Sequence, residues 1–213
     1  YRIWVSEVML QQTRSETVRA YYERWLRRFP DLNTLADAPI DDVLKQWEGL
    51  GYYSRARNLH RAAALLREQY HGSLPTDPEA LRKLPGIGEY TAGAIASIAY
   101  GKRTAAIDGN VKRVLARVLD QPSPSAALLR EAAAALVSPE RPGDFNQGLM
   151  ELGATICTPR SPKCDACPIS DWCLARQNRT QLQRPARSKA AALPVRKFNT
   201  VVLLDAEGYV LIS

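Results

Sequence analysis

All four cysteines of the 213-residue sequence lie in one window of 17 residues, in the pattern C-x6-C-x2-C-x5-C formed by Cys157, Cys164, Cys167 and Cys173. Thiols this close in sequence indicate a metal or cluster site. A disulfide framework is a poor alternative, because the sequence shows no secretory leader and no other cysteine. Four thiolates bind either tetrahedral zinc or an iron–sulfur cluster, and the spacing alone favours zinc.

A glycine-rich turn, LPGIG at residues 84–88, separates two segments with helical periodicity. We expect Gly86 and Gly88 to adopt backbone angles that are closed to other residues. The amides of the turn and of the following helix would then converge on an anion, as in a sequence-independent phosphate site. An ordinary helical hairpin accounts for the same five residues, so this short motif leaves both readings open.

Two carboxylates lie in settings that suit acid and anion chemistry. Helical spacing places Ile3 and Leu10 on the same face as Glu7, and apolar neighbours raise the pKa of a carboxyl until it is a usable proton donor. Asp108 precedes Gly109 and is expected to cap the helix that begins near Asn110. Periodicity by itself favours plainer roles, a surface glutamate and a structural cap.

Six motifs in series cover about residues 1–175. By these motifs the sequence resembles the MutY-type adenine DNA glycosylases, which belong to the helix-hairpin-helix, endonuclease III-like DNA glycosylase superfamily. One motif could arise by chance, but six in the family order are not expected to. They are SEVMLQQT, WEGLGYYSRARNLH, LPGIGEYTAGAI, AIDGNVKRVLAR, FNQGLMELGATICT and the cysteine loop.

The resemblance implies DNA base-excision repair, in which adenine mispaired with 8-oxoguanine or guanine is flipped out and its N-glycosidic bond is hydrolysed. This reaction needs an acid for the departing base and an anion beside the cationic sugar. By similarity Glu7 is the general acid, Asp108 stabilises the oxocarbenium ion or forms a transient adduct, and Asn110 positions water or the Asp108 carboxylate. Strand-cleaving relatives carry a lysine at the position of Tyr90, so monofunctional base removal is expected.

The resemblance also assigns DNA contacts and the cofactor. Gln12 is expected to wedge into the space that the extruded adenine leaves, and Tyr52 to intercalate beside the opposing base; core packing is the alternative for Tyr52. The four cysteines are expected to hold a [4Fe-4S] cluster. The other expected DNA contacts are Gln11, Thr13, Gly86, Gly88, Arg160 and Lys163. The alternative function is an endonuclease III-like glycosylase/lyase for oxidised pyrimidines.

Composition adds context to these motifs. The formal charge is +7, but residues 176–197 carry seven basic and no acidic side chains, so residues 1–175 are nearly neutral. Net charge is therefore weak support for nucleic-acid binding. No apolar run reaches the roughly 18 residues that would suggest a membrane span. We expect an intracellular, cytoplasmic monomer, associated with the nucleoid if bacterial, whose partner is double-stranded DNA with an adenine mispair.

The elements that must position these residues are helices. Helical periodicity extends to about residue 175, with breakers between short segments, which predicts an all-α glycosylase core of residues 1–175. The core should comprise a helical barrel lobe and an iron–sulfur lobe with DNA between them, the hairpin at about 78–100 and the cluster loop at 157–173. A basic linker is expected at 176–197, and 198–213 as the truncated β-hairpin start of a nudix-like domain. The sequence is thus expected to be a piece of a longer protein.

Overall fold

The computed structural model describes residues 1–186, and within that range every regular element is helical. The all-α prediction is confirmed, while the predicted strands at 198–213 lie outside the described residues. The α-helices are α1 (Arg2–Leu10), α2 (Ser15–Arg28), α3 (Leu32–Asp37), α4 (Ile40–Trp47), α5 (Ser54–Gln69), α6 (Pro78–Arg82), α7 (Glu89–Tyr100), α8 (Gly109–Val118), α9 (Ala126–Leu136), α10 (Pro142–Glu151) and α11 (Leu174–Gln177).

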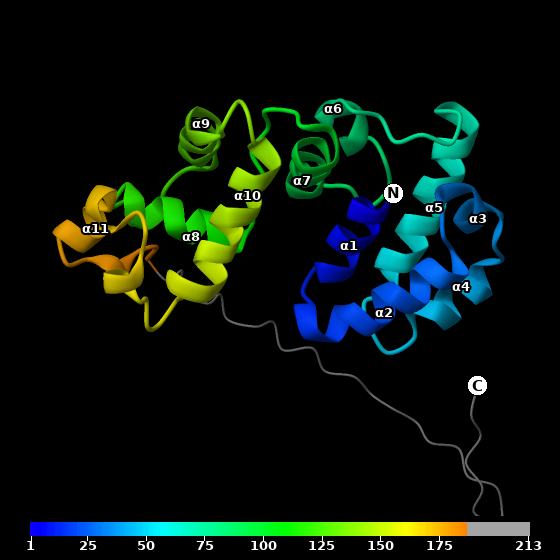
Figure 1. Ribbon diagram of the computed structural model, residues 1–213, viewed down its shortest axis with the longest axis horizontal. Helices are drawn as coiled ribbons and strands as arrows, with labels where there is room; N and C mark the ends of the chain where they lie inside the picture. The colour runs from blue at the N-terminus through cyan, green and yellow to red at the C-terminus, as the bar shows by residue number, and fades with distance from the viewer. Residues whose placement is uncertain (187–213) are drawn as a thin grey trace, which may run out of the picture.

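Helices α1–α7 surround the larger hydrophobic core (Figure 1). At its centre the Trp25 ring meets Phe29 and Trp47 edge-on, with centroid distances of 4.9 and 5.5 Å. Helix α5 contributes a buried stripe that includes Leu59 and Leu66, which are seven residues apart and so lie on one face of the helix. Helix α1 packs against α2, α5 and α7, so Glu7 is held on a helix that this core supports on several sides.

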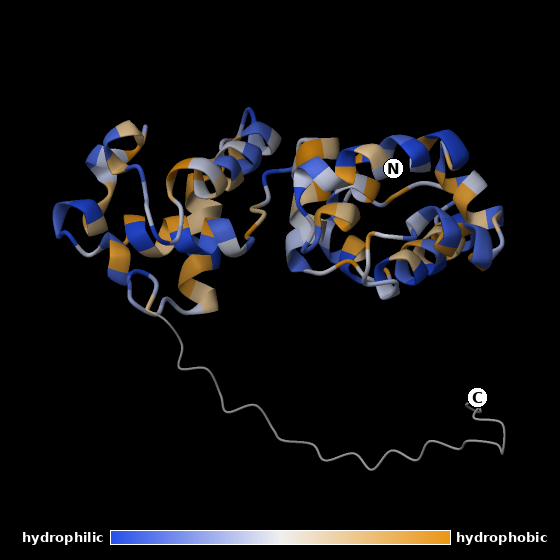
Figure 2. Cartoon of the chain, turned by 90° about the horizontal axis from the view of Figure 1, so that it is seen from below, coloured by the Kyte–Doolittle hydropathy of each residue, from blue (hydrophilic) through white to orange (hydrophobic). Residues whose placement is uncertain are grey.

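Helices α8–α11 form a second group around a smaller core. In Figure 1 this group lies on the opposite side of α7 from α1–α5, and Figure 2 shows the same two groups from below. The two groups are joined where α10 packs on α7. The buried Asn146 of α10 donates to Ser97 of α7 at 2.9 Å and accepts from the Ala106 amide at 3.1 Å. Because these buried polar groups satisfy one another, the junction between the two cores is specific rather than merely apolar.

The glycine-rich turn joins α6 to α7 as a helical hairpin, in agreement with the predicted helices. Gly86 has φ +77°, and a Cβ there would lie 2.8 Å from the Cβ of Asn58, so both conformation and space require glycine. Gly88 corrects the prediction, because its φ of −88° and ψ of −179° are accessible to any residue. Gly88 is the N-cap of α7, and no atom lies within 4 Å of a Cβ added there.

Candidate active site and cluster loop

Glu7 is 7% exposed, on the face of α1 that turns toward the junction of the two cores. Burial raises the pKa of its carboxyl above the usual value, and the negative charge of Asp108 adds to that rise. A hydrogen bond from Tyr90 acts in the opposite direction. A carboxyl in this balance holds a proton at a higher pH than an exposed glutamate, as a proton donor must.

Tyr90, the second residue of α7, donates its phenol proton to Oε2 of Glu7 at 2.7 Å. The same phenol lies 3.3 Å from the sulfur of Met150 on α10. Burial, and after it the charge of Glu7, raises the pKa of Tyr90, so the phenol remains a donor. Tyr90 is therefore bound to the predicted acid, and it does not merely pack at the start of its helix.

Asp108 is the N-cap of α8, as predicted. Its Oδ1 accepts from the amide of Val111 at 2.7 Å, and its Oδ2 accepts from the side-chain amide of Asn110 at 2.9 Å. Its charge also contributes to the raised pKa of both Glu7 and Tyr90. The structure thus brings Glu7, Tyr90, Asp108 and Asn110 together, although they come from three helices and span about half of the sequence.

Sequence reasoning missed an arginine that connects this group to the cysteine loop. Arg113 donates to Oδ1 of Asn110 at 2.8 Å and, from the same guanidinium, to the carbonyl of Cys157 at 2.8 Å. It also donates to the carbonyl of Gly153, in the π-helix η1 (Leu152–Ile156). A Cβ on Gly153 would lie 2.6 Å from the Cβ of Asn110, so close packing here depends on glycine.

The four cysteines are free thiols that line one small cavity. Burial, together with the charges of the other three cysteines, raises the pKa of Cys164, as expected where thiols face one another. Thiolates around one zinc ion lie about 2.3 Å from it. Within residues 1–186 no three His, Cys, Asp or Glu side chains are close enough to hold a single ion. Four thiols on one cavity are a donor set for either zinc or an iron–sulfur cluster.

Arg117, a second arginine of α8, supports the start of this loop and is only 2% exposed. It donates to the sulfur of Cys157 at 3.2 Å and to the carbonyl of Thr158 at 2.8 Å. Further bonds go to the carbonyls of Cys157, Pro159 and Arg184. Because one guanidinium fixes several consecutive peptides, the first cysteine is held on a rigid backbone.

The predicted wedge residues lie on the surface of the first helical group. Gln12 is exposed, and Tyr52 is 62% exposed, so core packing is wrong for Tyr52. Both have left-handed backbones, with φ of 58° and 48°. Gln11 donates to Thr91 at 3.2 Å, and Thr13 accepts from Arg55. The remaining predicted DNA contacts Gly86, Gly88, Arg160 and Lys163 are all exposed.

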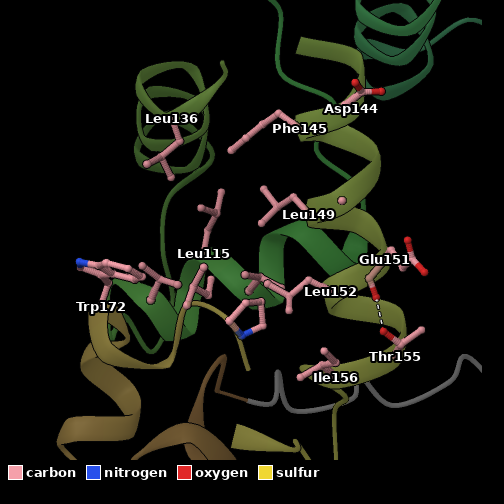
Figure 3. A pocket seen from close by; sticks show the side chains of 15 residues that line it. Leu115, Leu136, Asp144, Phe145, Leu149, Glu151, Leu152, Thr155, Ile156 and Trp172 are labelled. Carbon is pink, nitrogen blue, oxygen red and sulfur yellow. Dashed lines mark hydrogen bonds between the residues drawn. The ribbon is translucent and has the colours of Figure 1, made fainter. Parts of the chain in front are cut away.

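A hollow of about 620 Å³ lies between α8, α9, α10 and the segment around Trp172, and neither Glu7 nor Asp108 lines it (Figure 3). Leu115, Phe145 and Leu149 point into it, and its wall is nearly all apolar. It contains none of the predicted site residues. The lining includes two carboxylates, but Asp144 and Glu151 are both exposed and Asp144 pairs with Arg141, so the candidate site remains the buried Glu7 group.

Comparison with known proteins agrees with this geometry. Residues 5–139 match the model of the HhH-GPD superfamily of base excision DNA repair proteins. The chain belongs to this superfamily. Residues 157–173 match the iron-sulfur binding domain of endonuclease III, which confirms the iron–sulfur prediction over zinc. The match covers all four cysteines, from Cys157 to Cys173.

Several members are similar over most of this chain. The adenine DNA glycosylase of Homo sapiens is 49% identical over 91% of the chain, and that of Buchnera aphidicola (strain Bp) is 37% identical over all of it. The chain spans 37% and 62% of those relatives. A solved thermostable thymine-DNA glycosylase gives a TM-score of 0.78 at 31% identity, with 84% of each chain covered. An endonuclease III–DNA complex gives 0.73 at 24% identity, with 84% of this chain and 85% of that one covered, and shows the shared fold.

One further finding concerns membranes: among the described residues, no helix is long and apolar enough to cross a bilayer.

Proposed function

We propose that this chain is the catalytic region of a monofunctional adenine DNA glycosylase, which excises adenine mispaired with 8-oxoguanine or guanine. The observation that carries the proposal is the buried Glu7 carboxyl, which accepts a 2.7 Å hydrogen bond from Tyr90 and senses the charge of Asp108. The similarity to adenine DNA glycosylases over most of the chain supports the choice of base.

The chemistry assigned to these side chains is hydrolysis of the bond between adenine and C1′ of its sugar. Glu7 gives its proton to a ring nitrogen of the departing adenine, while Asp108 stabilises the cationic sugar by its charge or by a transient bond. Water then adds to C1′ and loses a proton, which restores the protonated Glu7. The products are adenine and an abasic site. Asn110, bonded to Oδ2 of Asp108, orients that carboxylate.

DNA would be held by features on both helical groups. The amides of the turn at Gly86 and of the N-terminus of α7 suit a phosphate, because the helix dipole is positive there. Gln12 and Tyr52 are exposed where a wedge must enter the base stack. Arg160 and Lys163 are exposed on the cysteine loop and would contact the phosphate backbone. A four-iron cluster, when bound, supplies the rigid framework of that loop.

The test is base release from a duplex that contains adenine opposite 8-oxoguanine, with alkali added to reveal abasic sites. We expect cleavage after alkali only, and no adduct trapped by borohydride, because Tyr90 offers no amine for a Schiff base. A trapped adduct, or release of an oxidised pyrimidine instead of adenine, would favour the glycosylase/lyase alternative. We expect the active form to be an intracellular monomer.

The preference for 8-oxoguanine is a separate part of the proposal. We expect adenine to be released faster opposite 8-oxoguanine than opposite guanine. Equal amounts of adenine:8-oxoguanine and adenine:guanine duplex would be compared under single-turnover conditions, and equal rates on the two duplexes would contradict this expectation.

A further inference from the structure

Arg55, near the start of α5, is a buried cation with no carboxylate partner among residues 1–186. It is 8% exposed, and its guanidinium instead donates to six oxygen atoms. Five of these are backbone carbonyls and one is a hydroxyl. The acceptors are the carbonyls of Val8, Met9, Gln11, Leu50 and Gly51 and the Oγ1 of Thr13.

These acceptors come from two segments that are far apart in sequence: the last turn of α1 with the loop after it, and the loop before α5. Nη1 donates to the carbonyls at the end of α1, where the helix dipole is negative and the carbonyls have no partner within the helix. Nη2 donates to Thr13 Oγ1 and to the carbonyls of Leu50 and Gly51 before α5, at 3.2 Å each. One planar group therefore fixes the loop after α1 and the loop before α5 in a single geometry.

Each loop carries one strained residue at its tip. Gln12 lies between two of the acceptors, Gln11 and Thr13, and has φ 58°. Tyr52 directly follows Gly51, has φ 48°, and its ring centroid lies 5.5 Å from Cζ of Arg55. Non-glycine residues in this region are strained and persist only where their surroundings hold them. Arg55 provides such a restraint for both residues at once.

We propose that Arg55 is a positioning residue that presents Gln12 and Tyr52 to DNA as one preorganised wedge. This inference rests on the proposed function, in which both side chains enter the base stack. Among the described residues, none of the hydrogen bonds of Arg55 goes to a side chain of the Glu7 group. Its effect should therefore appear in extrusion of the base, and not in the chemical step that follows.

The experiment compares Arg55→Lys and Arg55→Met with the unchanged protein on two substrates. One duplex has adenine opposite 8-oxoguanine, and the other has adenine opposite a tetrahydrofuran abasic analogue, where no base pair must be broken. A lysine cannot reach six acceptors in two loops, so the single-turnover rate on the paired duplex should fall about 100-fold. On the unpaired adenine the fall should be several-fold smaller. Equal losses on both substrates would overturn the proposal.

A double-mutant comparison makes the assignment sharper. If Arg55 acts through the wedge, then Arg55→Lys should add little to a protein that already carries Gln12→Ala and Tyr52→Ala. Full additivity would contradict the proposal. Arg67→Lys is the matched control, because Arg67 lies on the same helix, pairs with Asp37 at the surface and touches neither loop. Its rates should equal those of the unchanged protein.

A second variant and a separate readout of base extrusion keep the proposal testable if the Arg55 variants do not fold. Should both Arg55 variants fail to fold, Thr13→Val removes one acceptor of Arg55, together with the long bond from the Thr13 hydroxyl to the Gln11 carbonyl, and should reduce the paired-duplex rate about tenfold. Extrusion is read separately by the fluorescence of 2-aminopurine at the target position. Its absence with the unchanged protein would overturn the wedge; extrusion without any adenine release would overturn only the proposed function.

Discussion

Replacement of Glu7 by glutamine tests both the chemistry and the burial of the candidate acid. Glutamine keeps the size of the side chain and an oxygen that accepts from Tyr90, now at 2.7 Å. It cannot transfer a proton to a departing base, and loss of a general acid typically reduces a rate by about 10²–10⁴-fold. We expect a loss of adenine release within this range, with binding to the duplex retained.

The same substitution should stabilise the protein, because burial raises the pKa of Glu7 above its usual 4.5. The folded state then binds the proton more tightly than the unfolded chain, so wild-type stability falls as the pH rises from 4.5 through the folded pKa. Glutamine has no such dependence. At neutral pH we expect a gain of about 0.5–2 kcal/mol, typical of relieved active sites, and a smaller gain at pH 4.

The assay is thermal unfolding of both proteins between pH 4 and pH 8, beside single-turnover adenine release. A gain of 1 kcal/mol corresponds to about 2–4 °C in Tm for a chain of this size. Glu23→Gln, at an exposed position on α2, is the matched control and should show no comparable shift. The reasoning fails if Glu7→Gln retains adenine release within about tenfold of wild type, or if its Tm difference is the same at both ends of the pH range.

Two other substitutions test the surroundings of the acid. Tyr90→Phe removes the hydrogen bond that lowers the pKa of Glu7, so the alkaline limb of the rate–pH profile should move to higher pH; a shift to lower pH would contradict this. Gly153→Ala places a Cβ 2.6 Å from Asn110 and should cost about 1–3 kcal/mol in urea unfolding, with slower adenine release. Gly148→Ala, which meets no atom within 4 Å, is the matched control, and an equal loss there would refute the steric argument.

Much of the fold follows from local chemistry that a sequence displays openly. The helical periodicity, the cap at Asp108 and the breakers at helix ends all depend on neighbours within a few residues, and each is observed as predicted. Gly86 was predicted correctly for the same reason, while Gly88 was not. A glycine in a turn indicates freedom to adopt unusual angles, but only the folded backbone shows whether that freedom is used.

The candidate site was accessible from sequence because its chemistry resides in side-chain types within recognisable motifs. The encounter of Glu7 with Tyr90 depends on how α1 packs against α7, which no local pattern specifies. The contact of Met150 with Tyr90 could not be predicted, since a methionine on a helix is usually explained by ordinary packing. Arg55 did leave a trace, because it falls at positions i, i+4 and i+11 with the buried Leu59 and Leu66.

The binding partners of three buried or half-buried arginines could not be predicted from the sequence, for one shared reason. Arg55, Arg113 and Arg117 bind mainly to backbone carbonyls, and every residue has a carbonyl, so their partners leave no mark in the amino-acid types. An ion pair would have required a carboxylate that periodicity could locate. Where loops must keep strained or irregular shapes, a guanidinium that satisfies several orphan carbonyls at once is an effective restraint. A charged residue on an otherwise buried helix face is therefore the sequence feature that most directly marks such a restraint.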